Sequence, residues 1–94
     1  MKIVLTEQAQ NDQDDIYDYI RERSARGAFK VVTAVERTFR LISEHPEIGE
    51  ATDREGIRAI AVPRFPYWVF YRIGVDSVEV VHIRHAARQP WASS

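Results

Sequence analysis

Residues 57–83, IRAIAVPRFPYWVFYRIGVDSVEVVHI, set the architecture expected for this 94-residue chain. They contain three runs rich in β-branched and aromatic residues, which predict strands at Ile57–Val62, Tyr67–Ile73 and Val78–Ile83. Turn residues separate the runs, Pro63-Arg64-Phe65-Pro66 in the first case and Gly74-Val75-Asp76-Ser77 in the second. Because such short connections favour antiparallel neighbours, the stretch predicts a three-stranded meander.

A strand and a helix are expected before this meander. Lys2–Leu5 is a short apolar run, and Thr6 followed by Glu7 is typical of a helix N-terminus, where a hydroxyl and an acid stabilise free amides. The apolar residues of this helix that can share one face are Ala9, Ile16, Tyr19 and Ile20. Gly27 is expected to end the helix or to lie in the bend just after it.

A second helix is predicted from about Ala28 to Glu44. Its apolar residues recur at spacings of three and four: Ala28, Val31, Val32, Val35, Phe39 and Ile42. Pro46 ends it, because the proline ring disfavours the helical conformation for His45. Residues 46–56 hold two glycines and four acids without periodicity and predict a surface loop.

The element order is therefore βααβββ, which predicts an α+β fold with a helical hairpin packed on an antiparallel sheet. An apolar fraction of 45% in 94 residues suffices for one core, so we expect residues 1–94 to form a single domain. The chain has no cysteine, which excludes disulfides and thiolate sites and agrees with a reducing compartment. No apolar run is long enough for a signal peptide or a membrane span, so we expect a cytoplasmic protein that is not embedded in a membrane.

Charge is distributed unevenly along the chain. Residues 1–56 hold 8 Lys and Arg against 12 Asp and Glu, a net charge of -4, whereas residues 57–94 hold 5 Arg against 2 acids, a net charge of +3. The exclusive use of arginine in the second part indicates an anionic target or partner, because the guanidinium group binds phosphates and carboxylates with paired hydrogen bonds. A solvated, salt-bridged face is the alternative.

Four segments in this order resemble the ParE/RelE toxin superfamily, whose members are often labelled plasmid stabilisation proteins. They are Leu41-Ile-Ser-Glu-His-Pro-Glu-Ile-Gly49, Gly56-Ile-Arg58, Phe65-Pro-Tyr-Trp-Val-Phe-Tyr71-Arg72 and His85-Ala-Ala-Arg88. The resemblance spans nearly the whole chain. It implies a bacterial toxin that halts growth and forms a hetero-oligomer with a cognate antitoxin, ParD-like or of another small family.

The resemblance also implies two alternative mechanisms. RelE-like members are ribosome-dependent mRNA endonucleases, whereas ParE-like members poison DNA gyrase without nuclease activity. Nucleases of the superfamily surround the phosphate with lysines and arginines or with a Glu, Arg and His set. Here the only lysines are Lys2 and Lys30, and Trp68 occupies the position where the second kind of nuclease carries an arginine. We therefore favour a ParE-like gyrase inhibitor without catalytic residues of its own.

Two sets of site residues follow from these alternatives. The residues expected to contact gyrase are Arg58, Arg64, Arg72, Arg88 and Trp91. If the chain is instead an mRNA endoribonuclease, the usable residues are Arg58, Arg72, His82, Arg84, His85 and Arg88. A module that has lost toxicity is a third possibility. Arg58 and Arg88 match arginines that recur in the superfamily, but both could also be structural bridges, and Trp91 could close the core or form a contact.

We expect neither a metal site nor another cofactor at the histidines of the last predicted strand. Simple alternation places Val81, Ile83 and His85 on one face, and Val78, Val80, His82 and Arg84 on the other. His82 and His85 then point in opposite directions, and no cysteine is available to complete a metal site. For each histidine we favour a hydrogen-bonded structural role over a role as a base.

Overall fold

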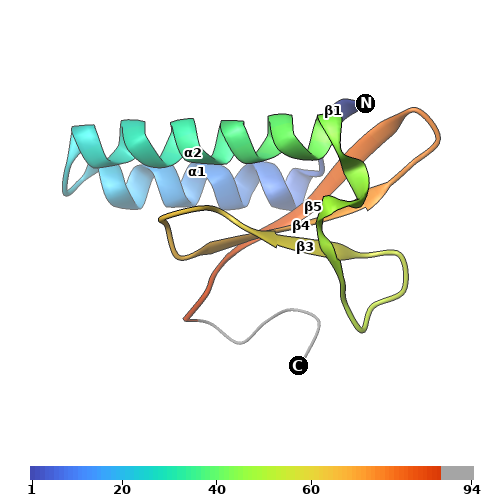
Figure 1. Cartoon of the computed structure of the whole chain (residues 1–94). Helices are drawn as coiled ribbons and strands as arrows, with labels where there is room; N and C mark the ends of the chain where they lie inside the picture. The colour runs from blue at the N-terminus through green and yellow to red at the C-terminus, as the bar shows by residue number, and fades with distance from the viewer. Residues whose placement is uncertain (88–94) are drawn as a thin grey trace.

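The computed structural model describes residues 1–87, so two of the predicted contact residues, Arg88 and Trp91, lie outside the described residues. The elements are β1 (Lys2–Leu5), α1 (Glu7–Arg21), α2 (Ala25–Glu44), the 3-10 helix η1 (Pro46–Ile48), β2 (Glu50–Ala51), β3 (Arg58–Ala61), β4 (Tyr67–Ile73) and β5 (Ser77–His85). Figure 1 shows the two helices side by side along one face of the sheet. The predicted α+β fold, with a helical hairpin packed on a sheet, is confirmed.

The sheet has the strand order β1-β5-β4-β3-β2. The antiparallel meander of β3, β4 and β5 is confirmed, but β1 runs parallel to β5, with Leu5 opposite Val80, so the sheet is mixed. This difference arises because the α1–α2 hairpin carries the chain across one face, which leaves β1 to pair with the edge of β5 in the parallel direction. The segment predicted as a loop contains η1 and the short strand β2, which pairs with β3.

Side-chain caps set the helix boundaries. The Thr6 hydroxyl accepts a hydrogen bond of 3.1 Å from the Ala9 amide, as expected for the start of α1. The prediction for Gly27 is wrong, because Ser24 caps α2 by accepting a 2.9 Å hydrogen bond from the Gly27 amide. Gly27 thus lies in the first turn of α2, where an added Cβ would lie 3.3 Å from Cγ2 of Ile20 on α1.

The main core lies between the helices and the sheet. Its fully buried side chains include Ile42, Val69, Tyr71, Val78 and Val80, and Phe65 packs against it, so Tyr71 and Phe65 serve packing as expected. Tyr19 is an exception to the predicted helix face. The residue is 58% exposed, and the Arg23 guanidinium carbon lies 3.8 Å from its ring centroid. No helix in the described part of the chain has the length and apolar character needed to cross a membrane.

A β-bulge changes the faces of β5. Phe70 of β4 lies opposite His82, but the next residue, Tyr71, lies opposite Val80, so Val81 is the extra residue. Val80 and Ile83 consequently both face the main core. The predicted alternation, which separated these two residues, is wrong because the bulge shifts the pleat by one residue. Val81 instead packs with a second, smaller cluster of Ile57, Ala59 and Phe70.

Candidate functional site

Arg58 and Tyr71 hold the segment that follows α2. They lie opposite each other on β3 and β4. The Tyr71 hydroxyl donates a 2.6 Å hydrogen bond to the Pro46 carbonyl and accepts one of 2.8 Å from the Gly49 amide. Arg58 Nη1 donates to the carbonyls of Gly49, at 2.7 Å, and of Glu47, at 3.3 Å. Arg58 therefore holds η1 in position through these hydrogen bonds. Its contact with a target stays a prediction.

Burial raises the pKa of the Tyr71 phenol above its ordinary value, and the hydrogen bond from Gly49 and the nearby charge of Arg58 act in the opposite direction with smaller effect. The phenol therefore stays protonated at neutral pH and can donate its hydrogen bond to the Pro46 carbonyl. This polar contact in the core fixes the position of η1 relative to the sheet.

A chain of polar side chains joins α1 to β5 and includes two of the predicted nuclease residues, His82 and Arg84. The Asp12 carboxylate accepts a 2.9 Å hydrogen bond from the Ile83 amide and also forms a short hydrogen bond with Nδ1 of His82. Arg84 Nη1 lies 3.1 Å from Nε2 of His82. Because a guanidinium can only donate, Nε2 accepts and Nδ1 carries the proton directed at Asp12.

The position of these linked polar side chains follows from the length of β1. Since β1 ends at Leu5, no strand among residues 1–87 pairs with this edge of β5 beyond Val80, and α1 covers that edge instead. Thr6 donates a 3.2 Å hydrogen bond to the Val81 carbonyl, and Asp12 follows on the same helix. Sequence reasoning missed Asp12, because it is one of several acids on α1 and no spacing distinguishes it.

The other predicted residues have varied surroundings. The His85 ring packs edge-on against Tyr67, with 5.3 Å between the centroids, and its Nδ1 accepts a 3.0 Å hydrogen bond from the Ala87 amide. Arg72 forms an exposed cross-strand ion pair with Glu79, 2.6 Å between Nε and Oε1. Such an exposed pair contributes at most about 1 kcal/mol to stability.

The structure does not bring together Arg58, Arg64 and Arg72, the predicted contact arginines within residues 1–87. Arg58 lies on the helix side of the sheet with Tyr71, whereas Arg72, the next residue on β4, points to the opposite side. Arg64 lies in the connection between β3 and β4 with a positive φ of 73°. Of the predicted nuclease residues between 58 and 85, His82 and Arg84 are in direct contact. Within residues 1–87, no three His, Asp or Glu side chains are grouped as a metal site.

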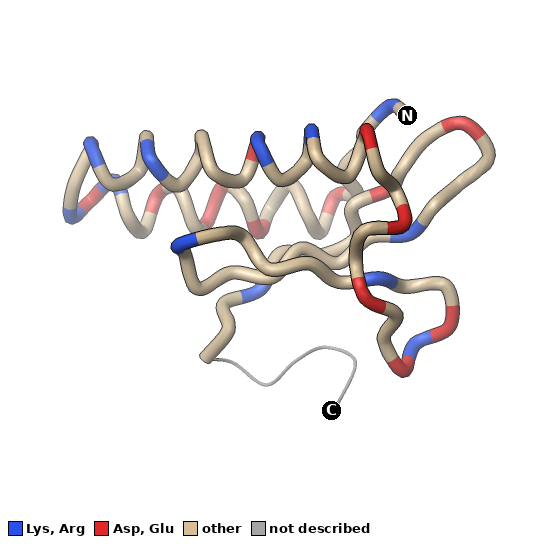
Figure 2. The backbone as a smooth tube through the Cα atoms, viewed as in Figure 1, with Lys and Arg blue, Asp and Glu red and all other residues tan. Residues whose placement is uncertain are grey.

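Arg64 instead lies near two cations of α2, Lys30 and Arg37. The three residues line a depression of about 990 Å³ between α2 and the β3–β4 connection, which we call the α2 groove. Its apolar lining includes Phe29, Ala34, Leu41, Ile60 and Phe65. Figure 2 shows the basic positions along α2 and at the β3–β4 connection below it.

The contribution of α2 to this groove does not show in the net charges of the two parts of the sequence, because Lys30 and Arg37 lie in the acidic part. The available signal was the spacing of Lys30 and Arg37, which are seven residues apart and therefore lie on the same face of a helix after two turns. Cations beside an apolar surface suit a segment that presents apolar and acidic side chains together.

Comparison with known proteins gives consistent matches. The family model described as ParE toxin of type II toxin-antitoxin system, parDE, matches residues 3–90. Toxin ParE1 of Caulobacter vibrioides is 33% identical over 84 residues, which cover 86% of this chain and 84% of the relative. Toxin RelE2 of the same bacterium is 31% identical over 87 residues, covering 93% and 97%.

A solved structure described as the chromosomal ParDE TA system from P. aeruginosa has the same fold, with a TM-score of 0.75. The match covers 90% of this chain and 95% of that chain at 23% sequence identity. The two Caulobacter relatives carry the names of both branches of the superfamily at nearly equal identity. Overall similarity therefore does not separate the two mechanisms.

Proposed function

This chain belongs to the ParE toxin family of type II toxin-antitoxin systems, and we propose that it inhibits DNA gyrase by contact and is neutralised by a cognate antitoxin. The observation that carries the proposed mechanism is the set of contacts made by the two histidines of β5. Arg84 donates to Nε2 of His82, the ring nitrogen that would have to accept a proton, and His85 packs against Tyr67. Cleavage of RNA without a metal needs a group that takes the proton of the 2′-hydroxyl. Histidines engaged in this way support binding rather than cleavage.

The second candidate is a RelE-like, ribosome-dependent mRNA interferase. The hydrogen bond between Asp12 and Nδ1 of His82 favours it, because a carboxylate in that place orients an imidazole as a general base. Arg84 would then have to leave Nε2 of His82 and move to the scissile phosphate. The 31% identity with Toxin RelE2 also supports this candidate.

The proposed partner is an antitoxin, ParD-like or of another small family, that binds the toxin in the cytoplasm. The α2 groove supports this proposal, since its lining combines apolar side chains with Lys30, Arg37 and Arg64. An acidic, amphipathic segment of the antitoxin would match both features. The solved structure with the same fold is itself described as a ParDE system.

Two assays on the same induced protein test the mechanism. Primer extension on total RNA detects cleaved mRNA, and a supercoiling assay with purified gyrase detects inhibition. We expect inhibited supercoiling and intact mRNA. Ribosome-phased cuts with unaffected supercoiling would replace the gyrase mechanism with the interferase. Unimpaired growth after induction without antitoxin would indicate the non-toxic interaction module.

A further inference from the structure

The structure has a second depression beside the α2 groove, and we propose that the two bind one antitoxin segment with ordered charges. The segment carries carboxylates at the end over Lys30, Arg37 and Arg64, apolar side chains in the middle, and cations at the end over Glu44 and Glu47. The inference rests on the proposed function and adds the length, the charge order and the orientation of the bound segment.

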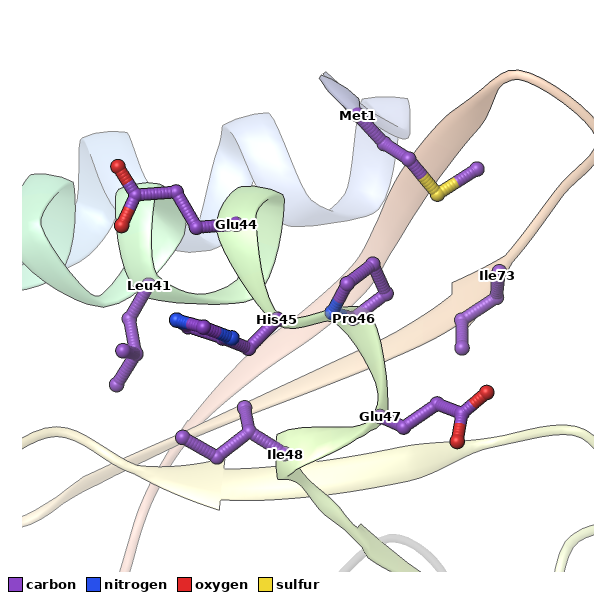
Figure 3. Close-up of a pocket in the computed structure, with 8 residues that line it drawn as sticks. All are labelled: Met1, Leu41, Glu44, His45, Pro46, Glu47, Ile48 and Ile73. Atoms are coloured by element: carbon purple, nitrogen blue, oxygen red, sulfur yellow. The ribbon is translucent and has the colours of Figure 1, made fainter.

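The two depressions meet at Leu41, which lines both. The second has a volume of about 800 Å³ and lies where α2 passes into η1. Figure 3 shows Leu41, His45 and Ile48 on the side of this depression toward the body of α2, and Met1 and Ile73 beyond Pro46. Because Leu41 belongs to both linings, the two depressions adjoin each other along α2.

The charges at the two ends of this surface are opposite. Lys30, Arg37 and Arg64 line the first depression, and Glu44 and Glu47 line the second. Figure 2 shows the same order, with basic positions along α2 and acidic positions where the chain turns out of it. The Met1 ammonium at the acidic end is used within the protein, since it donates a 2.6 Å hydrogen bond to the Ser43 carbonyl. A segment of uniform charge would therefore be repelled at one end.

Exposed apolar side chains accompany both depressions. Phe29 of the first is 71% exposed, and Ile48 of the second is 45% exposed. Met1 and Ile73 in the second depression are also among the exposed large apolar residues. Exposed apolar surface gathered at a depression marks an interaction site more strongly than scattered exposed residues do. Leu41, which lies between the two charged ends, also belongs to this apolar lining, so the middle of the segment should be apolar on its bound side.

The length of the segment follows from α2. Lys30 and Glu44 are fourteen residues apart on one helix, so the charged ends are separated by about 21 Å at 1.5 Å per residue. A helix of about fourteen residues or an extended strand of about six spans that distance. A shorter segment could satisfy only one end.

Charge reversal on α2 and η1 tests the inference. The partner tested is the purified protein encoded directly beside this gene, and the affinity is measured by calorimetry at physiological salt. We expect Arg37→Glu and Glu47→Lys each to weaken binding at least tenfold. The matched controls, Arg40→Glu and Glu36→Lys, change exposed charges of α2 outside both depressions and should stay within about threefold, since such charges are screened. Circular dichroism confirms that each variant is folded.

The outcomes separate this inference from the proposed function. A wild-type chain that does not bind the neighbouring product, or does not arrest growth, would refute the function itself. If binding occurs but Arg37→Glu acts like Arg40→Glu, the α2 groove is not the site. If Glu47→Lys leaves affinity unchanged or raises it, the segment does not reach the second depression. Concentration-dependent dimerisation lost in both test variants would identify a second copy of the chain as the occupant.

The orientation can be tested because the chain has no cysteine, so a single introduced cysteine is a unique attachment point. Thr33→Cys lies in the first depression and Ile48→Cys in the second. A photo-crosslinker attached at Thr33→Cys should react with the acidic end of the antitoxin segment, and at Ile48→Cys with the basic end. Crosslinks in the reverse order would overturn the inferred orientation.

Discussion

Gly49 and Tyr71 approach each other so closely that no side chain fits between them. The Gly49 amide donates a 2.8 Å hydrogen bond to the phenol oxygen, and a Cβ on Gly49 would lie 2.6 Å from the same oxygen. The backbone of Gly49, with φ of -73°, is accessible to any residue. Glycine is therefore required here for space and not for conformation. This contact joins η1 to the middle of β4.

Replacing either partner should destabilise the fold. Gly49→Ala forces the phenol to move and should lower the free energy of unfolding by about 1–3 kcal/mol, as overpacking does. Tyr71→Phe leaves the Pro46 carbonyl and the Gly49 amide without their hydroxyl partner and should cost about 1–3 kcal/mol. Because both changes disrupt the same contact, the double variant should lose less than the sum. Urea unfolding measures all three, and strictly additive losses would contradict a shared contact.

The raised pKa of Tyr71 predicts a loss of stability at alkaline pH. The folded state holds the phenol proton more tightly than the unfolded chain, whose tyrosine pKa is about 10. The contribution is complete below that pKa and is lost as pH rises through the folded pKa. Wild type should therefore lose more stability than Tyr71→Phe between pH 8 and pH 10.5 in urea unfolding. Parallel losses in the two proteins would show that another group is responsible.

Asp12 should matter more to stability than its acidic neighbours on α1. Asp12→Ala removes the acceptor for the Ile83 amide and the partner of His82, and should cost about 2–3 kcal/mol because partly buried groups are left unsatisfied. Asp14→Ala is the matched control, since Asp14 is exposed and its side chain accepts only from Gln10. It should change stability by no more than about 0.5 kcal/mol. Equal losses would show that the contacts of Asp12 are not stabilising.

Arg72 offers a test of target contact that is separable from folding. Its exposed ion pair with Glu79 contributes little, so Arg72→Ala should change stability by less than about 0.5–1 kcal/mol. If Arg72 is a hot spot of the gyrase contact, inhibition of supercoiling should weaken at least tenfold, since truncating such an arginine costs about 2 kcal/mol or more. Glu79→Gln is the control, because it removes the ion pair but keeps the arginine. Full inhibition by Arg72→Ala would remove this residue from the proposed contact.

The fold could be predicted where local chemistry decides the structure. The turn residues around Phe65 and Gly74, and the apolar spacing of α2, gave the correct order of elements. Simple alternation failed on β5, because the bulge at Val81 results from pairing with β4 and has no glycine or proline to mark it. The prediction for Gly27 was wrong because the position of this residue also depends on packing between elements. Its small size serves contact with Ile20, which lies on another helix.

The site was harder to predict because its residues are remote in sequence. Arg58 was recognised, but its acceptors are backbone carbonyls of η1, and a carbonyl leaves no mark on the sequence. His82 was a candidate without its partner, since Asp12 lies 70 residues earlier on α1. The α2 groove combines Lys30 and Arg37 of α2 with Arg64 of the strand region. Only the packing of the hairpin on the sheet reveals that combination.

The histidines of β5 decide between contact and catalysis. An asparagine amide can replace Nδ1 of His82 as a donor to Asp12, so His82→Asn tests the imidazole with the least structural change. If the chain acts by contact, His82→Asn and His85→Ala should arrest growth at the same inducer level as wild type. A general base contributes about 10²–10⁴-fold to a rate, so a nuclease would lose toxicity in one of them. Growth arrest in liquid culture gives the answer, provided immunoblots show equal amounts of protein. Recovery of growth with either variant, at unchanged gyrase inhibition, would favour the interferase.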